Sequence, residues 1–125
     1  MALPPTSFDV YSEASLPPLR RELWQDGPAL LKFSATWCGP CKRVAPFFAA
    51  YALESKGRLT CHELDVEKDS KVAEYYHIRL LPTFLLLQDG AEVDRIESGD
   101  WDRVSAKLLA RHPAASLPAQ GAVGG

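Results

Sequence analysis

Short apolar runs alternate along this chain with stretches of helical periodicity, and this alternation limits the possible folds more than any other feature. Five runs have strand length, and the last two are joined by Asp89-Gly90, a dipeptide typical of a hairpin turn. Strands that are separated by helices pair in parallel through right-handed crossovers, whereas a hairpin adds an antiparallel edge. The sequence therefore predicts an α/β domain with a mixed sheet of about five strands and helices on both faces.

The expected strands are residues 8–11 (a weak run), 29–35, 59–66, 83–88 and 91–96. The expected helices are one that begins at Pro17-Pro18, carries Leu19 and Leu23 and ends near Gly27, then 40–56, 70–76 and 101–111. Asp100 is the predicted cap of the last helix. The side chains expected to face inward are Val44, Phe47, Phe48, Tyr51 and Ala52 on the second helix, and Val104, Leu108 and Leu109 on the last.

Length and charge set broad limits on function. A chain of 125 residues fits one domain, and 14 basic against 16 acidic residues give a net charge of -2 with both signs interspersed. No basic field is available for nucleic acid, and no apolar run approaches the length of a membrane span. The N-terminus lacks the features of a secretory signal, and three cysteines are too few for a disulfide scaffold. These features favour a reducing compartment, and we expect the cytoplasm.

The ends of the chain differ in composition from the middle. Five of the ten prolines lie in the first 28 residues, and the segment 113–125 is rich in Ala, Gly, Pro and Ser without any charged side chain. Proline lacks the N–H that regular structure needs, and such a tail has little to bury. We therefore expect an N-terminal extension over residues 1–7, one domain over 8–112 and a disordered tail over 113–125.

A Cys-x-x-Cys motif, Cys38-Gly39-Pro40-Cys41, follows Trp37 where a predicted buried strand passes into a predicted helix. Free N–H groups and the dipole at a helix N-terminus stabilise an anion, so a cysteine there ionises more readily to the thiolate that attacks disulfides. We expect Cys38 at the cap, exposed and activated, and Cys41 one turn further on, inside and within reach of Cys38. Pro40 suits the first turn, where its missing N–H costs nothing.

The segment FSATWCGPCK, from Phe33 to Lys42, followed by Pro46, closely resembles the active site of the thioredoxin family. The resemblance covers roughly residues 8–111, with further matches at 65–68, 78–83 and 89–90. It implies a thioredoxin fold and a thiol–disulfide oxidoreductase that reduces protein disulfides. In that role Cys38 is the nucleophile and Cys41 the resolving cysteine.

The resemblance also assigns a substrate groove. It implies that the Leu81-Pro82 peptide bond is cis and faces the cysteines, and that the Trp37 indole covers the redox site. The expected substrate-binding residues are Trp37, Gly39, Pro40, Leu81 and Pro82. Gly-Pro between the cysteines is typical of a low-potential pair, on the order of -270 mV, and hence of a reductant.

The implied partners are disulfide-containing protein substrates and a separate electron donor of the thioredoxin-reductase type. No motif such as GxGxxG is present, so we expect no bound cofactor and no metal. We also expect no nucleic-acid or membrane partner, and a monomer.

One position departs from the family. Where the family usually carries a buried aspartate, six residues before the first cysteine, this chain has Lys32, and the family's lysine partner falls on Glu63. We predict that the pair is present with its signs exchanged, and that Glu63 is a candidate proton acceptor for Cys41 with Lys32 as its charge partner. In the alternative interpretation Lys32 extends to the surface and Glu63 faces water.

Other interpretations of the same residues stay open. A lone Cys-x-x-Cys is also half of a zinc site, and Cys61-His62 would have to supply the rest, although adjacent strand residues point to opposite faces. Cys61 is either a small core residue or a regulatory thiol. At the level of function, the rivals are a thioredoxin-like binding subunit of a larger complex with little redox role, and an oxidant or isomerase of a secretory compartment.

Overall fold

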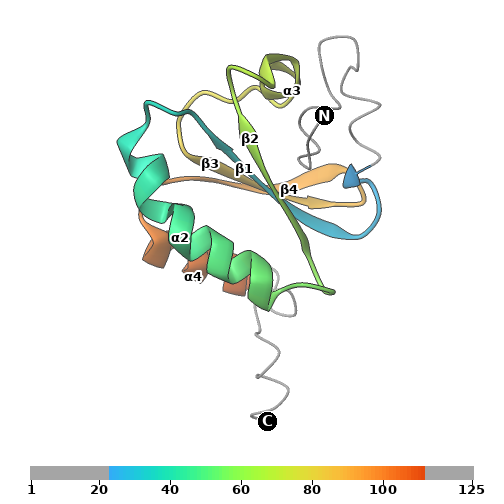
Figure 1. The fold of residues 1–125 in the computed structure, drawn as a ribbon. Helices are drawn as coiled ribbons and strands as arrows, with labels where there is room; N and C mark the ends of the chain where they lie inside the picture. The colour runs from blue at the N-terminus through green and yellow to red at the C-terminus, as the bar shows by residue number, and fades with distance from the viewer. Residues whose placement is uncertain (1–22, 112–125) are drawn as a thin grey trace.

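The computed structural model describes residues 23–111, which form a sheet with three helices (Figure 1). The elements in chain order are β1 (Pro28–Ser34), α2 (Gly39–Glu54), β2 (Thr60–Asp65), α3 (Ser70–Tyr75), β3 (Thr83–Gln88), β4 (Ala91–Glu97) and α4 (Trp101–Arg111). All seven elements predicted wholly within this range are present, with ends within two residues of the prediction. The first expected helix does not continue to Gly27, because residues 24–27 form a turn and bends. The weak strand 8–11, the helix start at Pro17-Pro18, the extension 1–7 and the tail 113–125 lie outside the described residues.

The sheet is mixed and has the strand order β2-β1-β3-β4. The described part of the chain thus contributes four strands, where about five were expected. β1 pairs with β2 in parallel, and β3 and β4 form the antiparallel hairpin predicted from Asp89-Gly90. The α/β class and the mixed sheet expected from the alternation of strands and helices are confirmed.

β3 runs antiparallel to β1, whereas the alternation of strands and helices predicted a parallel crossover. The reason lies in α3, which has only six residues, like the strand β2 before it. A helix of that length rises about 9 Å, whereas the strand spans about 20 Å. The chain therefore re-enters the sheet near the end at which β2 left it, and β3 runs back in the opposite direction.

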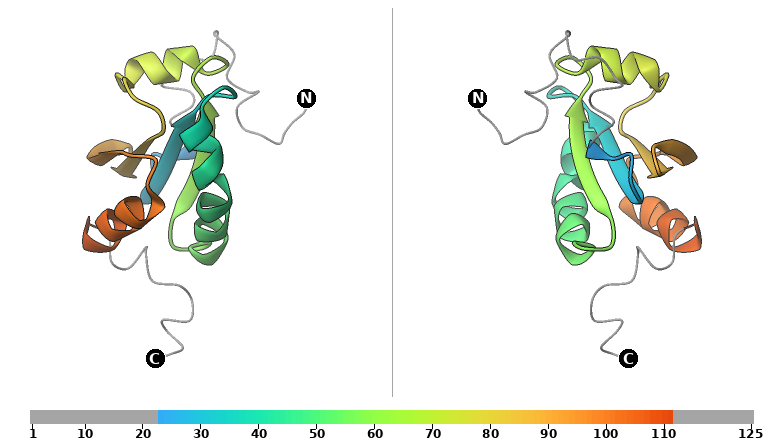
Figure 2. Two further views of the ribbon diagram at one scale, coloured as in Figure 1. Left: turned by 90° about the vertical axis from the view of Figure 1, so that its left-hand side faces the viewer. Right: turned by 90° about the vertical axis from the view of Figure 1, so that its right-hand side faces the viewer.

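Two apolar clusters fill the two faces of the sheet. On one face α2 and α4 pack side by side over a cluster of buried residues, Leu30, Val44, Phe48, Tyr51, Leu59, Phe84, Leu86, Ile96, Val104 and Leu108. The other face holds Trp24, Ala29, Leu31, Phe33, Leu64, Val72, Tyr76, Leu85 and Leu87. Both views in Figure 2 show α3 set apart from α2 and α4. β1 and β3 contribute to both clusters, which explains their almost uninterrupted apolar sequence.

Two side chains expected in the core lie at the surface. Phe47 is 54% exposed and stacks on Trp101 with ring centroids 6.4 Å apart, and Leu109 is 52% exposed. Both lie next in sequence to a buried residue, Phe48 and Leu108, at the edge of the helix face that packs on the sheet. A helix with 3.6 residues per turn turns such neighbours about 100° away from the buried stripe.

No helix within residues 23–111 is both long enough and apolar enough to cross a membrane.

Candidate active site

The two cysteines of the motif form a disulfide at the N-terminus of α2. Cys38 is the N-cap residue, with extended backbone angles, and the Cα atoms of Cys38 and Cys41 are 5.3 Å apart. The backbone N–H of Cys41 donates to the Sγ of Cys38 at 3.2 Å. The first turn of the helix thus offers a hydrogen-bond donor to this sulfur, an arrangement that stabilises a thiolate once the disulfide is reduced.

The exposure of Cys38 differs from the prediction. Cys38 is only 5% exposed in the disulfide form, compared with 2% for Cys41, so both are buried where an exposed Cys38 was expected. The reason is packing, because both cysteines form a small cluster with Ala35, against which Val66 and Leu81 pack. Cys38 does lie at the helix cap, as predicted. A position at the cap does not by itself expose the side chain to solvent.

The residues assigned to a substrate groove come from two segments near the disulfide, residues 37–40 and 81–82. Trp37 is 66% exposed, and its Nε1–H donates to Glu67 Oε2 at 3.0 Å, which fixes the indole at the surface. Gly39 and Pro40 are also exposed, at the start of α2. The Leu81-Pro82 peptide bond, which precedes β3, is cis, as predicted. Pro82 itself is buried and Leu81 half-buried.

Sequence reasoning missed Gly99, which precedes α4. A methyl group built on Gly99 would lie 2.8 Å from Pro40 Cβ and 3.5 Å from Pro82 Cδ, so the loop before α4 touches both the motif and the cis-proline segment. Only a residue without a side chain permits this approach. A glycine between Ser98 and the predicted helix cap Asp100 is the available sequence signal, but nothing local indicates which surface it meets.

On the inner side of the disulfide, the structure brings together the predicted pair of exchanged signs. Lys32 Nζ lies 2.9 Å from Glu63 Oε2, and the same nitrogen donates to the backbone carbonyl of Cys41 at 3.2 Å. The two strands lie side by side with Lys32 opposite Glu63 in the register. Ser34 Oγ also donates to Glu63 Oε2, at 3.1 Å, a third member that the sequence analysis did not include. The alternative in which Lys32 reaches the surface is wrong, since its side chain is 1% exposed.

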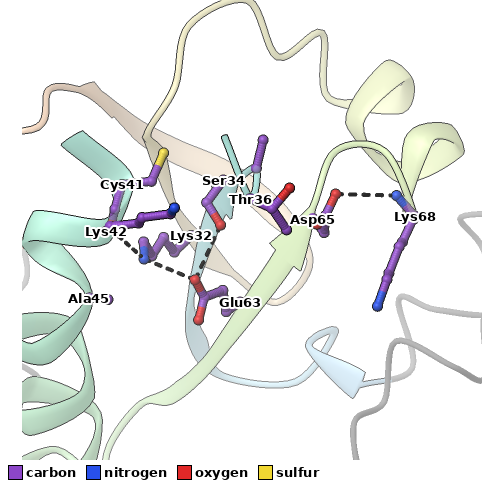
Figure 3. Close-up of a pocket in the computed structure, with 10 residues that line it drawn as sticks. Lys32, Ser34, Thr36, Cys41, Lys42, Ala45, Glu63, Asp65 and Lys68 are labelled. Atoms are coloured by element: carbon purple, nitrogen blue, oxygen red, sulfur yellow. Dashed lines mark hydrogen bonds and ion pairs between the residues drawn. The ribbon is translucent and has the colours of Figure 1, made fainter. Parts of the chain in front are cut away.

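These polar groups line a cavity of about 470 Å³ beside α2 (Figure 3). Its walls consist of Lys32, Ser34, Ala35, Thr36, Cys41, Lys42, Ala45, Glu63, Asp65 and Lys68. Cys41 and the half-exposed carboxylate of Glu63 therefore both line one cavity.

The third cysteine is separate from this site. Cys61 is half-buried and packs against the cluster beneath α2 and α4, and burial raises the pKa of its thiol to about 11. A thiol with that pKa carries almost no thiolate near neutral pH, so Cys61 behaves as a core residue. Within residues 23–111, no group of three or more His, Cys, Asp and Glu side chains is arranged to hold a metal ion.

Comparison with known proteins identifies the family of the chain. A family model described as Thioredoxin matches residues 18–110, which include the cysteine pair, Lys32 and Glu63. The chain belongs to the thioredoxin family. With a cysteine pair that forms a disulfide at a helix cap, this thioredoxin-family protein is a thiol–disulfide oxidoreductase of the protein-disulfide-reductase class.

Individual thioredoxins show how far the similarity extends. The chain is 43% identical over 67 residues to a thioredoxin H-type of Oryza sativa, a match that spans 54% of each chain. It is 38% identical over 88 residues to a thioredoxin H-type of Chlamydomonas reinhardtii, covering 70% of this chain and 77% of the relative. In structure it resembles the Fasciola hepatica thioredoxin, with a TM-score of 0.68, 31% identity and coverage of 81% and 94%.

Proposed function

We propose that this thioredoxin-family protein reduces disulfides of protein substrates in two steps. In the reduced protein, the Cys38 thiolate attacks one sulfur of a substrate disulfide; a mixed disulfide forms and the other substrate sulfur leaves as a thiolate. The Cys41 thiolate then attacks the Sγ of Cys38, so that the intramolecular disulfide forms and the second substrate thiolate is released. Two electrons pass from the cysteine pair to the substrate, and each substrate thiolate takes up a proton.

The observation that carries this assignment of roles is the geometry of the pair. Cys38 caps α2 and its Sγ accepts the N–H of Cys41, whereas Cys41 lies within the first turn and is the less exposed of the two. The sulfur at the cap has the helix dipole to stabilise its thiolate, and the inner sulfur has no direct route to a large substrate.

The substrate groove is proposed to consist of Trp37, Gly39, Pro40, Leu81 and Pro82. The first three are exposed beside the disulfide, and Leu81 packs against the cysteine cluster. None of these five side chains carries a charge. Such a rim suits an extended polypeptide, whose backbone brings its own polar groups and whose side chains vary from one substrate to the next.

The same chemistry implies a partner and a setting. Each turnover leaves the Cys38–Cys41 disulfide, so a separate electron donor of the thioredoxin-reductase type has to reduce it, because the chain carries no nucleotide-binding motif. We infer a monomer that works in the cytoplasm, with residues 8–112 as its single domain. The three cysteines and the low-potential Gly-Pro pair favour such a reducing compartment.

Reduction of insulin disulfides by dithiothreitol, followed by turbidity, tests the proposal. We expect the wild-type protein to accelerate the reaction, Cys38→Ser to abolish the acceleration, and Cys41→Ser to accumulate a covalent mixed disulfide visible on a non-reducing gel. Cys61→Ser is the matched control and should behave as wild type. A Cys38→Ser variant that keeps its activity would instead favour a binding subunit with little redox role.

A further inference from the structure

Two large aromatic side chains, Phe47 of α2 and Trp101 of α4, form an aromatic stack at the surface of the protein. Phe47 is 54% exposed, and its ring lies nearly parallel to the indole of Trp101, with centroids 6.4 Å apart and 15° between the planes. Trp101 is held in turn by edge contacts to the rings of Tyr51 and Phe84, at 5.8 Å and 5.9 Å. Both of those rings are buried. The stack is therefore a fixed apolar platform, and its outer ring is open to solvent over more than half of its surface.

The aromatic stack belongs to the same surface as the redox motif. Gly99, two residues before Trp101, approaches the motif so closely that a methyl group built on it would lie 2.8 Å from Pro40 Cβ. Pro40 is exposed, and Phe47 lies seven residues further along α2, which is two turns along one face of the helix. α2 and α4 pack side by side on one face of the sheet (Figure 1). Exposed aromatic rings beside a reactive site are typical of a binding surface.

A cation lies between the motif and the aromatic stack. Pro40, Arg43 and Phe47 have the spacing i, i+3 and i+7 on α2, so they share one face of the helix, and all three are exposed. Arg43 forms no ion pair with any of residues 23–111. One nitrogen of its guanidinium would lie 3.5 Å from a methyl group built on Gly39, so the charge is held near the motif. This guanidinium is available to a carboxylate of a bound partner.

The spacing along this face of α2 matches the spacing of an extended polypeptide. Counted from the cap residue Cys38, the rise along the helix is about 7.5 Å to Arg43 and about 13.5 Å to Phe47, at 1.5 Å per residue. An extended chain advances about 3.3 Å per residue, so these distances correspond to about two and about four residues. Side chains at alternate positions of an extended chain point to the same face. A substrate cysteine at Cys38 therefore places its second and fourth neighbours over Arg43 and Phe47.

We propose that the Arg43 guanidinium and the aromatic stack of Phe47 and Trp101 form a substrate-recognition site. Its occupant is an extended polypeptide substrate with an acidic side chain two residues from the reactive cysteine and an aromatic side chain four residues from it. The carboxylate pairs with Arg43, and the aromatic ring packs on the exposed ring of Phe47. This assignment rests on the proposed function, in which Cys38 attacks the substrate disulfide. The groove beside the cis-proline takes the substrate chain on the other side of its cysteine.

Peptides whose single cysteine carries a 2-nitro-5-thiobenzoate group test this site. The Cys38 thiolate of the reduced protein attacks the peptide sulfur and the coloured thiobenzoate thiolate leaves, so its release gives a second-order rate constant. Two peptides carry Glu at the second and Trp at the fourth position, before the cysteine in one and after it in the other, and reference peptides carry Ala at both. We expect one of the two directions to react about 10-fold faster than its reference. Moving Glu and Trp to the third and fifth positions turns them to the opposite face and should remove the advantage.

Variants assign the advantage to the two parts of the site. The ratio of rate constants for a Glu/Trp peptide and its reference is compared within each variant, because any change in the reactivity of Cys38 cancels from it. Phe47→Ala should remove the contribution of Trp, and Phe47→Tyr should keep it. Arg43→Glu should convert the preference for Glu at the second position into one for Lys, and added salt should weaken the preference for Glu in wild type. Leu53→Ala and Lys56→Glu, which alter exposed sites on another face of α2 and beyond its end, should keep the wild-type ratio.

Two outcomes would overturn the recognition site. One is equal rates for all peptides in wild type, and the other is a ratio that Phe47→Ala and Arg43→Glu leave unchanged or that Leu53→Ala lowers equally. If Phe47→Ala does not fold, Phe47→Met, which keeps the volume of the side chain but not the ring, takes its place. Unchanged ratios together with altered sedimentation of Phe47→Ala alone would assign the stack to self-association instead. Failure of the proposed function is a different result, because no peptide, including the references, would then release thiobenzoate rapidly.

Discussion

The two sides of the Cys38–Cys41 disulfide are built on different principles. The outer side is an uncharged rim whose exposed members, Trp37, Gly39 and Pro40, come from one continuous segment. The inner side is polar, and its ion pair joins Lys32 to Glu63 across 31 residues of chain. In the proposed function the outer side accepts polypeptides, so shape and backbone access matter there. The inner side has to keep a buried charge neutralised, so the partners of each polar atom matter instead.

The largest expected effect comes from breaking the inner side asymmetrically. Glu63→Leu leaves the buried Lys32 ammonium with only the Cys41 carbonyl as a polar partner, and we expect a loss of about 3 kcal/mol in the free energy of unfolding. This value is at the lower end for a broken buried pair because Glu63 is half-exposed. Lys32→Met removes the buried charge and leaves a carboxylate that water can solvate, so the loss should be less than about 1 kcal/mol. Urea unfolding of the oxidised proteins measures both.

The double variant Lys32→Met/Glu63→Leu provides the control for this asymmetry. It should recover most of the stability lost in Glu63→Leu, since the unpaired ammonium is then gone. Equal losses in the two single variants would show that the inner side is governed by packing rather than by charge.

A smaller effect is expected from Cys61, which lies on β2 outside the cavity and packs against the apolar cluster beneath α2 and α4. Burial raises the pKa of this thiol from 9.0 to about 11. Because the folded-state pKa lies above the unfolded one, the stability due to the neutral thiol is complete below about pH 9 and is lost as the pH rises toward 11. Between pH 8 and pH 10.5 the oxidised wild-type protein should lose on the order of 2 kcal/mol more than Cys61→Ala.

Urea unfolding at the two pH values checks this, and iodoacetamide labelling provides a second measurement. Cys61 should resist alkylation at pH 8 in the folded protein, whereas Cys38 is labelled first once the disulfide is reduced. If Cys61 reacts as fast as Cys38, the sheet face beneath α2 and α4 is open to reagents, and the thiol of Cys61 is not protected by burial.

The smallest effect concerns the outer side. Gly99→Ala would place a methyl group 2.8 Å from Pro40 Cβ, so the loop before α4 has to shift, at a cost of about 1 kcal/mol. We expect KM for insulin to rise several-fold while reduction of a small disulfide is unchanged. Gly39→Ala is the matched control for stability, because its new methyl group meets only the flexible Arg43 side chain at 3.5 Å and should cost little. Equal losses of stability in the two variants would show that the close approach of Gly99 to Pro40 is not what makes Gly99→Ala costly.

The sequence allowed most of the fold to be predicted, and the exceptions share a cause. Strand and helix periodicity located every element within residues 23–111, and Asp89-Gly90 located the hairpin. The predicted direction of β3 was wrong. The direction depends on how far the short helix α3 carries the chain along the sheet, and sequence periodicity gives no information about that distance. The predicted burial of Phe47 and Leu109 was wrong. A residue at the edge of an apolar stripe is buried or exposed according to what the neighbouring helix covers, and its own spacing in the sequence does not show this.

The sequence by itself determined the chemistry of the pair. Cys38, Gly39, Pro40 and Cys41 lie within one helical turn, so their mutual geometry follows from local backbone rules, and the cap position needs no distant partner. Tertiary structure alone decided the environment of that pair. The burial of Cys38, the meeting of Gly99 with Pro40, and the joining of Lys32, Ser34 and Glu63 beneath Cys41 all depend on strands and loops that are far apart in the chain. Contact between distant segments is set by packing over the whole sheet, which no local pattern encodes.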